Sequence, residues 1–309
     1  MKVLVITGDR NFKLGNPRFD LQRSHIDELV SIFWGKGSLL PRMPKNNFDI
    51  VTVQDPFWRG FFAWFCARRL RARFNVQVHT DLSAQSFFRR ILAQFILRRA
   101  DSIRVVSEKI KNQVEAFGVR APIHILHIFI DLPKFRNIIR HLHTRPRILW
   151  LGRFEKEKDP LAAISVLEKV RETGIDAELV MLGEGTMTQE VAKHASHKPI
   201  MDILRPGWSD VITYLGTAHV VLCTSLYEGW GASIVEAHEA GVPVVTPDVG
   251  VAKKLQEAGG AIVKIVPHEK LAEAVVDVLN STTADLKNEP KPWLVENPKE
   301  WAQRWKESL

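Results

Sequence analysis

Residues 228–236 read EGWGASIVE, so two glutamates enclose a Gly-Trp-Gly turn with seven residues between them. The residues after the turn have helical spacing. Unpaired amides at a helix N-terminus bind anions, and side chains one turn in lean back toward it. Glu236 would repel a phosphate there and suits a neutral diol such as a ribose, while Glu228 precedes the turn within reach of a sugar. The alternative is that Glu236 and Glu239 form a solvated helix face.

Two further loops carry residue types suited to binding phosphate. Arg153 and Lys158 follow the apolar run ILWLG and stand five positions apart, a spacing able to clamp a diphosphate from two sides. The alternative is a mixed-charge surface loop. The segment Gly183-Glu184-Gly185 follows the run ELVML, where glycines permit close backbone approach to a ligand, although a plain turn produces the same pattern.

These loops fall between short β-rich runs and longer helical stretches that alternate along the chain. In the first half we expect strands at 2–7, 49–54, 75–80, 102–107 and 123–128, and helices at 18–34, 57–73, 84–99 and 108–117. After a break at 136–147 we expect strands at 147–152, 177–182, 201–206, 220–225, 243–247 and 261–265, and helices at 159–173, 186–195, 232–240, 251–258, 268–280 and 298–309. The alternation predicts a parallel sheet in each half, with ligands bound outside the carboxyl ends of the strands.

The net charge of +8 is unevenly distributed over the 309 residues. Residues 1–140 hold 24 Lys and Arg against 11 Asp and Glu, whereas the remainder holds 19 against 24. The basic half predicts an anionic partner, and nucleic acid, a membrane surface or a phosphorylated substrate all fit that charge. Cys66 and Cys223 lie too far apart for a disulfide framework or a metal-site spacing and are expected to be buried.

The second half resembles the family-4-like group of retaining glycosyltransferases with the GT-B fold. EGWGASIVE resembles the family's E-x7-E motif, ILWLGRFEKEKDP its strand and GR-x4-K signature, and LVMLGEG its L-x-x-x-G-x-G. The segments FDIVTVQDPF, NVQVHTDL, ADSIRVVSEKIKNQVEAFGV and PKEWAQRWKESL match in order, so the resemblance covers roughly 250 residues. The resemblance implies two Rossmann-like βαβ domains facing a cleft, with the last helix returning to the first domain.

By this resemblance, the donor is a nucleotide-diphosphate sugar held by the second domain. Glu236 would bind the ribose, Arg153 and Lys158 would neutralise the leaving diphosphate, and Glu228 would hold the donor sugar. The backbone of Gly229, Trp230, Gly231, Ala232 and Ser233 would cradle sugar and phosphate, and Gly183 and Glu184 would line the same site. His79 matches a family histidine near the donor sugar and acceptor. No metal or other cofactor is expected, because the two cations replace the metal and no D-x-D is found.

Two departures concern the first half. The Gly-Gly turn usual after the first strand is replaced by GDRNFKLGNPRF, with Gly15 as the best counterpart, and Trp230 stands where the family has Phe. The first domain is also short for the family. We expect domains at 1–142 for the acceptor and 143–290 for the donor, with 291–309 as linker and final helix.

The sequence therefore predicts a metal-independent retaining glycosyltransferase of hexosyltransferase type. Its donor would be a UDP-, GDP- or ADP-sugar, and its acceptor a glycan or lipid-linked molecule in polysaccharide, glycolipid or cell-envelope biosynthesis. The alternatives are a catalytically degenerate relative that binds nucleotide sugar or glycan, and a GT-B-fold isomerase of a nucleotide sugar. A nucleic-acid partner is not expected, because it would leave the second half unexplained.

The helical stretches 59–74 and 86–100 interleave aromatic residues with arginines. Such stretches are able to lie on an anionic membrane surface, although amphipathic helices packed on a sheet give the same pattern. No run of about 18 apolar residues is found, and the opening run MKVLVITGDR is too short for a signal peptide. We therefore expect a cytoplasmic protein, peripheral at the inner face of the membrane if the basic half binds lipid.

Overall fold

The computed structural model describes residues 1–35, 41–44, 46–196, 201–204, 211–259, 261–281, 291 and 293–309. The chain forms two compact units. Unit 1 comprises Met1–Phe129 together with Trp293–Leu309, and unit 2 comprises Ile130–Pro292. No helix among the described residues has the length and apolar character needed to cross a bilayer.

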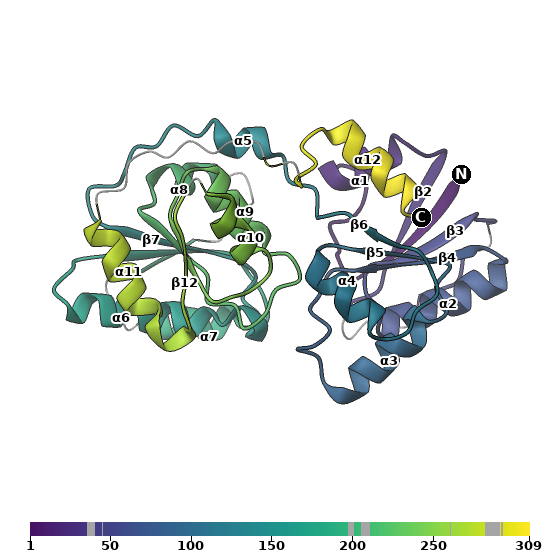
Figure 1. The fold of residues 1–309 in the computed structure, drawn as a ribbon, viewed down its shortest axis with the longest axis horizontal. Helices are drawn as coiled ribbons and strands as arrows, with labels where there is room; N and C mark the ends of the chain where they lie inside the picture. Colours follow the sequence, from purple (N-terminus) through teal and green to yellow (C-terminus); the bar gives the residue numbers. More distant parts are fainter. Residues whose placement is uncertain are drawn as a thin grey trace. The chain divides into compact units, whose positions relative to one another are not determined.

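Unit 1 is built on a six-stranded parallel sheet in the order β2-β1-β3-β4-β5-β6 (Figure 1). Its strands are β1 (Lys2–Thr7), β2 (Glu28–Phe33), β3 (Ile50–Val53), β4 (Arg73–Val78), β5 (Ser102–Val105) and β6 (Ile123–Ile125). Helices α1 (Pro17–Arg23) and α12 (Pro298–Glu307) cover one face (Figure 1). The other face is covered by α2 (Trp58–Leu70), α3 (Phe87–Leu97) and α4 (Glu108–Glu115).

Helix α12 joins unit 1 although it comes last in the chain, as the sequence predicts. Trp301 and Trp305 are fully buried, four residues apart on one helix face. The Trp301 indole donates a hydrogen bond to the carbonyl of His127 at 2.9 Å. The carbonyls of the last two residues also accept hydrogen bonds. Asn75 donates to the Ser308 carbonyl at 2.8 Å, and Ser102 donates to the Leu309 carbonyl at 2.7 Å. The C-terminus is thereby fixed to two central strands.

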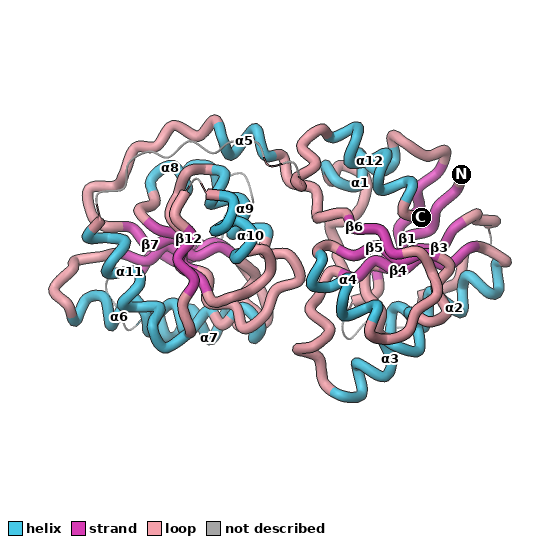
Figure 2. Tube along the Cα trace, in the orientation of Figure 1, coloured by secondary structure: helices cyan, strands magenta, loops and turns pink. Residues whose placement is uncertain are grey.

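Unit 2 has a second six-stranded parallel sheet, whose strands are magenta in Figure 2. The strand order is β12-β11-β10-β7-β8-β9. Its strands are β7 (Arg147–Leu151), β8 (Glu178–Leu182), β9 (Met201–Leu204), β10 (Val220–Leu222), β11 (Val244–Thr246) and β12 (Val263–Ile265). Helices α6 (Pro160–Glu172), α7 (Thr188–Ser196) and α11 (Leu271–Asn280) cover one face (Figure 1). The other side carries α5 (Leu132–Arg136), α8 (Val211–Thr217), α9 (Ala232–Glu239) and α10 (Ala252–Ala258).

The expected alternation of strands and helices is present in both units, but one expected helix is wrong. The stretch 18–34 is not one helix: α1 ends at Arg23, and Glu28–Phe33 forms the edge strand β2, paired in parallel with β1. Leu, Val, Ile and Phe in ELVSIF suit a strand beside β1, and that pairing overrides the helical spacing. The short helices α5 and α8 were not expected, and residues 205 and 206 of the expected strand 201–206 lie outside the described residues.

Residues 130–142, which the sequence assigns to the first domain, belong to unit 2 in the structure. One contact that holds this segment there is an ion pair within that unit: the Arg136 guanidinium of α5 donates to the Glu239 carboxylate of α9 at 2.5 and 2.6 Å. Glu239 is buried, so this contact holds the segment against α9.

Candidate active site

Three loops meet at the carboxyl ends of β7, β8 and β10, which are neighbours in the sheet of unit 2. The Gly152 amide donates to the Leu182 carbonyl at 3.1 Å, joining the loops after β7 and β8. The Thr224 hydroxyl, just after β10, donates to the carbonyls of Lys158 and Asp159 at 2.8 Å each. The loops that hold the candidate residues are therefore tied together by hydrogen bonds, one between backbone groups and the others from the Thr224 side chain.

Lys158 and Glu228 form an ion pair at this edge, between the Lys158 ammonium and Glu228 Oε1. The Ser225 hydroxyl donates to the same oxygen at 2.8 Å. Among the described residues nothing donates to Oε2, so this oxygen is available to accept hydrogen bonds from a ligand. Both side chains are largely buried, which strengthens the pair relative to a surface contact. The structure thus joins two of the residues that the sequence proposed as catalytic.

Arg153 lies apart from that pair. Its guanidinium is 67% exposed and donates to the Glu157 carboxylate at 2.9 Å, four residues further along the same loop. An exposed pair of this kind contributes little stability, so Arg153 is free to exchange Glu157 for another anion. Its proposed contact with a diphosphate stays a prediction.

The Gly-Trp-Gly turn positions the N-terminus of α9. Gly231 is the N-cap residue with φ of +86°, a conformation that favours glycine. Trp230 is buried, and its carbonyl accepts from the Val251 amide at 3.0 Å. In the part of the chain that the structure describes, the amides of Ala232 and Ser233 have no acceptor. Two N–H groups at the positive end of the helix are thus available to an anion.

Glu236 lies one turn into α9 and is buried, with 8% of its surface exposed. Its Oε2 is buried and has no hydrogen-bond partner among the described residues. Burial raises the pKa of Glu236 to about 8 from an ordinary value of 4.5. The alternative of a solvated acidic helix face is therefore wrong for Glu236 and also for Glu239, of which only 2% is exposed.

Glu239 is buried beside Glu236 but has cationic partners. Arg136 donates to its carboxylate, Lys291 lies at 3.4 Å and His238 Nδ1 at 3.2 Å. Burial alone would raise the pKa of Glu239, but the hydrogen bond with His238 and the charges of Lys291 and Arg136 outweigh burial and lower it. Sequence analysis missed this network, because Arg136 and Lys291 are far from Glu239 along the chain.

The glycines after β8 are required for packing between loops. A Cβ on Gly183 would lie 1.7 Å from the Gly152 carbonyl oxygen, and one on Gly185 would lie 2.4 Å from that of Phe154. Glu184 is exposed, and its carbonyl accepts from the Phe154 amide at 3.0 Å. These contacts account for both glycines without a ligand, so ligand binding by Gly183 and Glu184 stays a prediction.

The two remaining candidates belong to unit 1. His79 follows β4, and its buried Nε2 has no hydrogen-bond partner in the part of the chain that the structure describes. Burial, together with the charges of Arg104 and Arg18, holds the pKa of His79 well below 6.5, so the imidazole is neutral at pH 7. Gly15 has φ of +91° in the loop before α1, where its amide donates to the Asp20 carboxylate at 3.1 Å. Their roles at a sugar or an acceptor stay predictions.

Sequence reasoning missed Ser225 and Thr224. Both lie in the loop just after the buried strand β10, and together they hydrogen-bond to Glu228 and to the carbonyls of Lys158 and Asp159. Their signal was present, since polar residues after a buried parallel strand lie at the ligand-binding edge. Cys66 and Cys223 are free and buried, as expected.

The fold and this site define the chain as a GT-B protein, and the comparisons with known proteins agree. Residues 131–292 match the model of the glycosyl transferases group 1 family, and residues 2–134 match that of Glycosyltransferase Family 4. The chain belongs to the glycosyl transferases group 1 family.

Curated relatives are distant and longer. The glycogen synthase of Mycobacterium tuberculosis is 28% identical over 199 residues, which are 62% of this chain and 48% of the relative. The trehalose synthase of Rubrobacter xylanophilus is 28% identical over 141 residues, which are 41% of this chain and 34% of the relative. The chain thus spans half or less of the length of these relatives.

Solved structures share the fold at low identity. HepE of Anabaena, solved with UDP and glucose, has a TM-score of 0.71 at 14% identity, covering 98% of this chain and 95% of HepE. TarM of S. aureus has a TM-score of 0.61 at 18% identity, covering 84% of this chain and 51% of TarM. These likenesses support two parallel-sheet α/β domains of the GT-B type.

Proposed function

We propose that the chain transfers a glycosyl group from a nucleotide-diphosphate sugar to an acceptor hydroxyl, with retention of anomeric configuration. The observation that carries the proposal is the buried Glu236 Oε2, which has no hydrogen-bond partner among the described residues and lies one turn behind the two available amides of α9. A buried polar atom without a hydrogen bond is destabilising, so its presence at a ligand-binding edge favours a ligand that donates to it. A ribose diol supplies two such donors.

The rest of the donor follows from the charges around Glu236. The amides of Ala232 and Ser233 suit the diphosphate, because it is anionic, whereas the ribose is neutral. Lys158 and Arg153 add positive charge to the same edge, and Glu228 Oε2 accepts from hydroxyl groups of the donor sugar. UDP is the first nucleotide to test, since HepE was solved with UDP and with UDP-glucose.

In the proposed reaction, the bond between the sugar C1 and the phosphate oxygen breaks and a bond from C1 to the acceptor oxygen forms on the same face. The proton of the acceptor hydroxyl passes to the leaving phosphate. Negative charge grows on that phosphate as the bond breaks, so Arg153 and Lys158 stabilise the transition state more than the bound donor. His79, neutral at pH 7, would accept or donate a hydrogen bond near the sugar and acceptor. No step of this proposal requires a metal ion.

A glycan or a lipid-linked molecule of the cell envelope is the acceptor that the basic first half favours.

Two alternatives, a degenerate binding protein and an isomerase, predict different outcomes with the same donor. A binding protein would be stabilised by the nucleotide without releasing sugar, and an isomerase would convert the donor without needing an acceptor.

The deciding experiment incubates the full chain with UDP-, GDP- and ADP-sugars. We expect one free nucleotide to stabilise the protein by about 2.7 kcal/mol at a hundred times its Kd. We also expect the corresponding nucleotide sugar to be slowly hydrolysed. The anomer first released, read by NMR, reports retention directly. Stabilisation without hydrolysis or transfer would show a binding protein, and no response to any nucleotide would refute the proposal.

A further inference from the structure

Helices α2 and α3 of unit 1 present large apolar side chains to solvent. We call this surface the α2–α3 face and define it by Trp58, Phe61, Phe65, Phe87, Phe88 and Ile91, all exposed. Phe88 is 81% exposed and Trp58 71%. The two helices are joined by aromatic contacts, because the Phe61 and Trp64 rings of α2 lie 6.4 and 5.8 Å from the Phe95 ring of α3. Because these rings pack α2 against α3, the exposed apolar residues gather on two neighbouring helices and are not scattered singly.

The same segment is strongly cationic. Residues 56–100 contain nine arginines, no lysine and one acid, Asp81, which is buried and paired with Lys109. Only Arg59 of these arginines forms an ion pair within the described residues. The other eight have no carboxylate partner there: Arg68, Arg69, Arg71, Arg73, Arg89, Arg90, Arg98 and Arg99. This excess of unneutralised charge favours an anionic partner.

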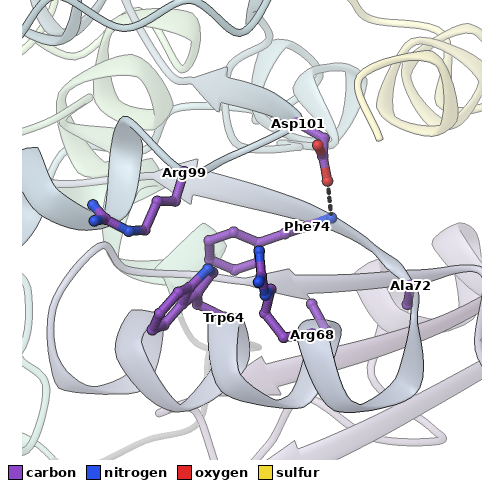
Figure 3. A pocket seen from close by; sticks show the side chains of 7 residues that line it. Trp64, Arg68, Ala72, Phe74, Arg99 and Asp101 are labelled. Atoms are coloured by element: carbon purple, nitrogen blue, oxygen red, sulfur yellow. Dashed lines mark hydrogen bonds between the residues drawn. The ribbon is translucent and has the colours of Figure 1, made fainter.

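A small pocket of about 280 Å³ opens between α2 and the end of α3 (Figure 3). Trp64 and Arg68 line it from α2, Phe74 forms its floor, and Arg99 approaches from the opposite side. The Arg99 guanidinium lies 3.5 Å from the Phe95 ring centre and 5.6 Å from that of Trp64. Asp101 also lines the pocket, but its carboxylate accepts from the Phe74 amide at 2.7 Å. Two guanidinium groups against one engaged carboxylate leave the pocket net positive.

We propose that the α2–α3 face binds the surface of an anionic lipid bilayer, with the Arg68 and Arg99 pocket holding a headgroup phosphate. Exposed Phe and Trp side chains gain free energy by entering the boundary between headgroups and acyl chains. Arginines beside them contact the phosphates, for which a planar guanidinium is well suited. This face therefore provides both the apolar side chains that insert into a bilayer and the positive charge that attracts an anionic one.

A bilayer fits this face better than a nucleic acid. Base stacking would use the aromatic rings, but Ile91 offers no ring and would gain nothing from a base. A hydrocarbon boundary accommodates Ile91, Phe87 and Phe88 alike. The surface is also bordered by arginines of both helices that have no carboxylate partner among the described residues, as expected where lipid phosphates surround inserted side chains.

Binding is measured by sedimentation of the full chain with phosphatidylcholine vesicles, with and without phosphatidylglycerol, over a range of salt concentrations. We expect binding only to the anionic vesicles and release as salt rises, because screening weakens surface attraction. Arg89→Glu with Arg90→Glu should weaken binding at least about tenfold. The matched control, Arg23→Glu with Lys306→Glu, makes the same charge change on the opposite face of the sheet and should bind nearly as the original chain does.

The apolar side chains and the pocket need separate variants. Phe87→Ser with Phe88→Ser should weaken binding to anionic vesicles without changing net charge. Arg69→Gln, which lies outside the pocket, should weaken binding to anionic vesicles about fivefold, and Arg99→Gln should weaken this binding more. Equal losses from Arg69→Gln and Arg99→Gln would refute the headgroup pocket.

Several results would overturn the bilayer itself as partner. Equal binding to neutral vesicles, no binding to either, or an equal loss in the control variant would each do so. Tighter binding to single-stranded oligonucleotides would assign the face to nucleic acid, and a dimer dispersed by the double Phe variant would assign it to a second copy. Donor hydrolysis should be unchanged in all these variants, so a failure here is distinguishable from a failure of the proposed transfer reaction.

Discussion

Replacing Glu236 by Gln should stabilise the protein in the absence of donor. Glu236 is buried with a raised pKa of about 8, so unfolding at neutral pH releases its proton. The folded state binds more protons at this group than the unfolded state does between pH 4.5 and 8. The stability of the original chain must therefore fall with rising pH across this window. Glutamine keeps the shape of the side chain and removes the titration.

The magnitude follows from the two pKa values. With 4.5 in the unfolded chain and about 8 in the folded one, the contribution of Glu236 to the unfolding free energy falls by roughly 3 kcal/mol between pH 5 and pH 8. We expect Glu236→Gln to gain stability relative to the original chain by this amount over that range. Near pH 8, where a substantial part of Glu236 is ionised, the same variant should bind the nucleotide more weakly, because an amide accepts hydrogen bonds from a diol less strongly than a carboxylate does.

Glu239→Gln is the matched control, because it changes another buried glutamate three residues away on the same helix. The pKa of Glu239 is lowered in the folded chain. Its pairing therefore stabilises the fold above the unfolded pKa, and this stabilisation is lost as the pH falls through the folded pKa. This variant leaves Arg136 and Lys291 without their carboxylate and should cost about 3 kcal/mol at pH 7.

Denaturant unfolding of the three proteins from pH 5 to pH 8, with nucleotide affinity measured by calorimetry, tests both statements. The two variants should depart from the original chain in opposite directions at pH 8. If Glu236→Gln is destabilised there, or follows the pH profile of the original chain, Glu236 is not a buried carboxyl with a raised pKa. If its nucleotide affinity is also unchanged, the ribose role is wrong.

Two further predictions concern catalysis. Glu228→Gln should lower kcat by roughly ten- to hundredfold while raising the donor KM less, because it removes a charged contact with the reacting sugar beside Lys158; equal effects on both constants in steady-state kinetics would contradict this. EDTA should leave transfer activity unchanged, because the diphosphate clamp is assigned to Lys158 and Arg153; loss of activity restored by magnesium or manganese would overturn that assignment.

The fold could be predicted because buried parallel strands and their crossovers leave local signals. Runs such as KVLVIT and SIRVVS are apolar and β-rich, and helices separate them at the spacing of βαβ units. The edge strand β2 was missed because ELVSIF follows a helix after only a short turn, and its strand state depends on pairing with β1. Local propensity does not include that tertiary contact.

The site was only partly predictable, for a different reason. The positions of Glu228, Lys158 and Glu236 followed from motif order, and the structure brings Lys158 to Glu228. What the sequence could not show was burial, since Glu236 and Glu239 both looked like surface acids on a helix. Whether a buried carboxylate has partners depends on Arg136 and Lys291, which are distant in sequence from α9.

The contrast between these two glutamates bears on how the site is maintained without a ligand. A buried oxygen without a partner destabilises its surroundings, so the surrounding structure must be held in place by other contacts. In α9 those contacts are close by: Glu239 holds Arg136 and Lys291, and His238 Nε2 lies 3.0 Å from the Gly259 carbonyl. The C-terminal half of the helix is thereby fixed while Glu236 remains unsatisfied. A donor that pairs with Glu236 then binds to a helix already in position, so little of its binding free energy is lost in ordering the site.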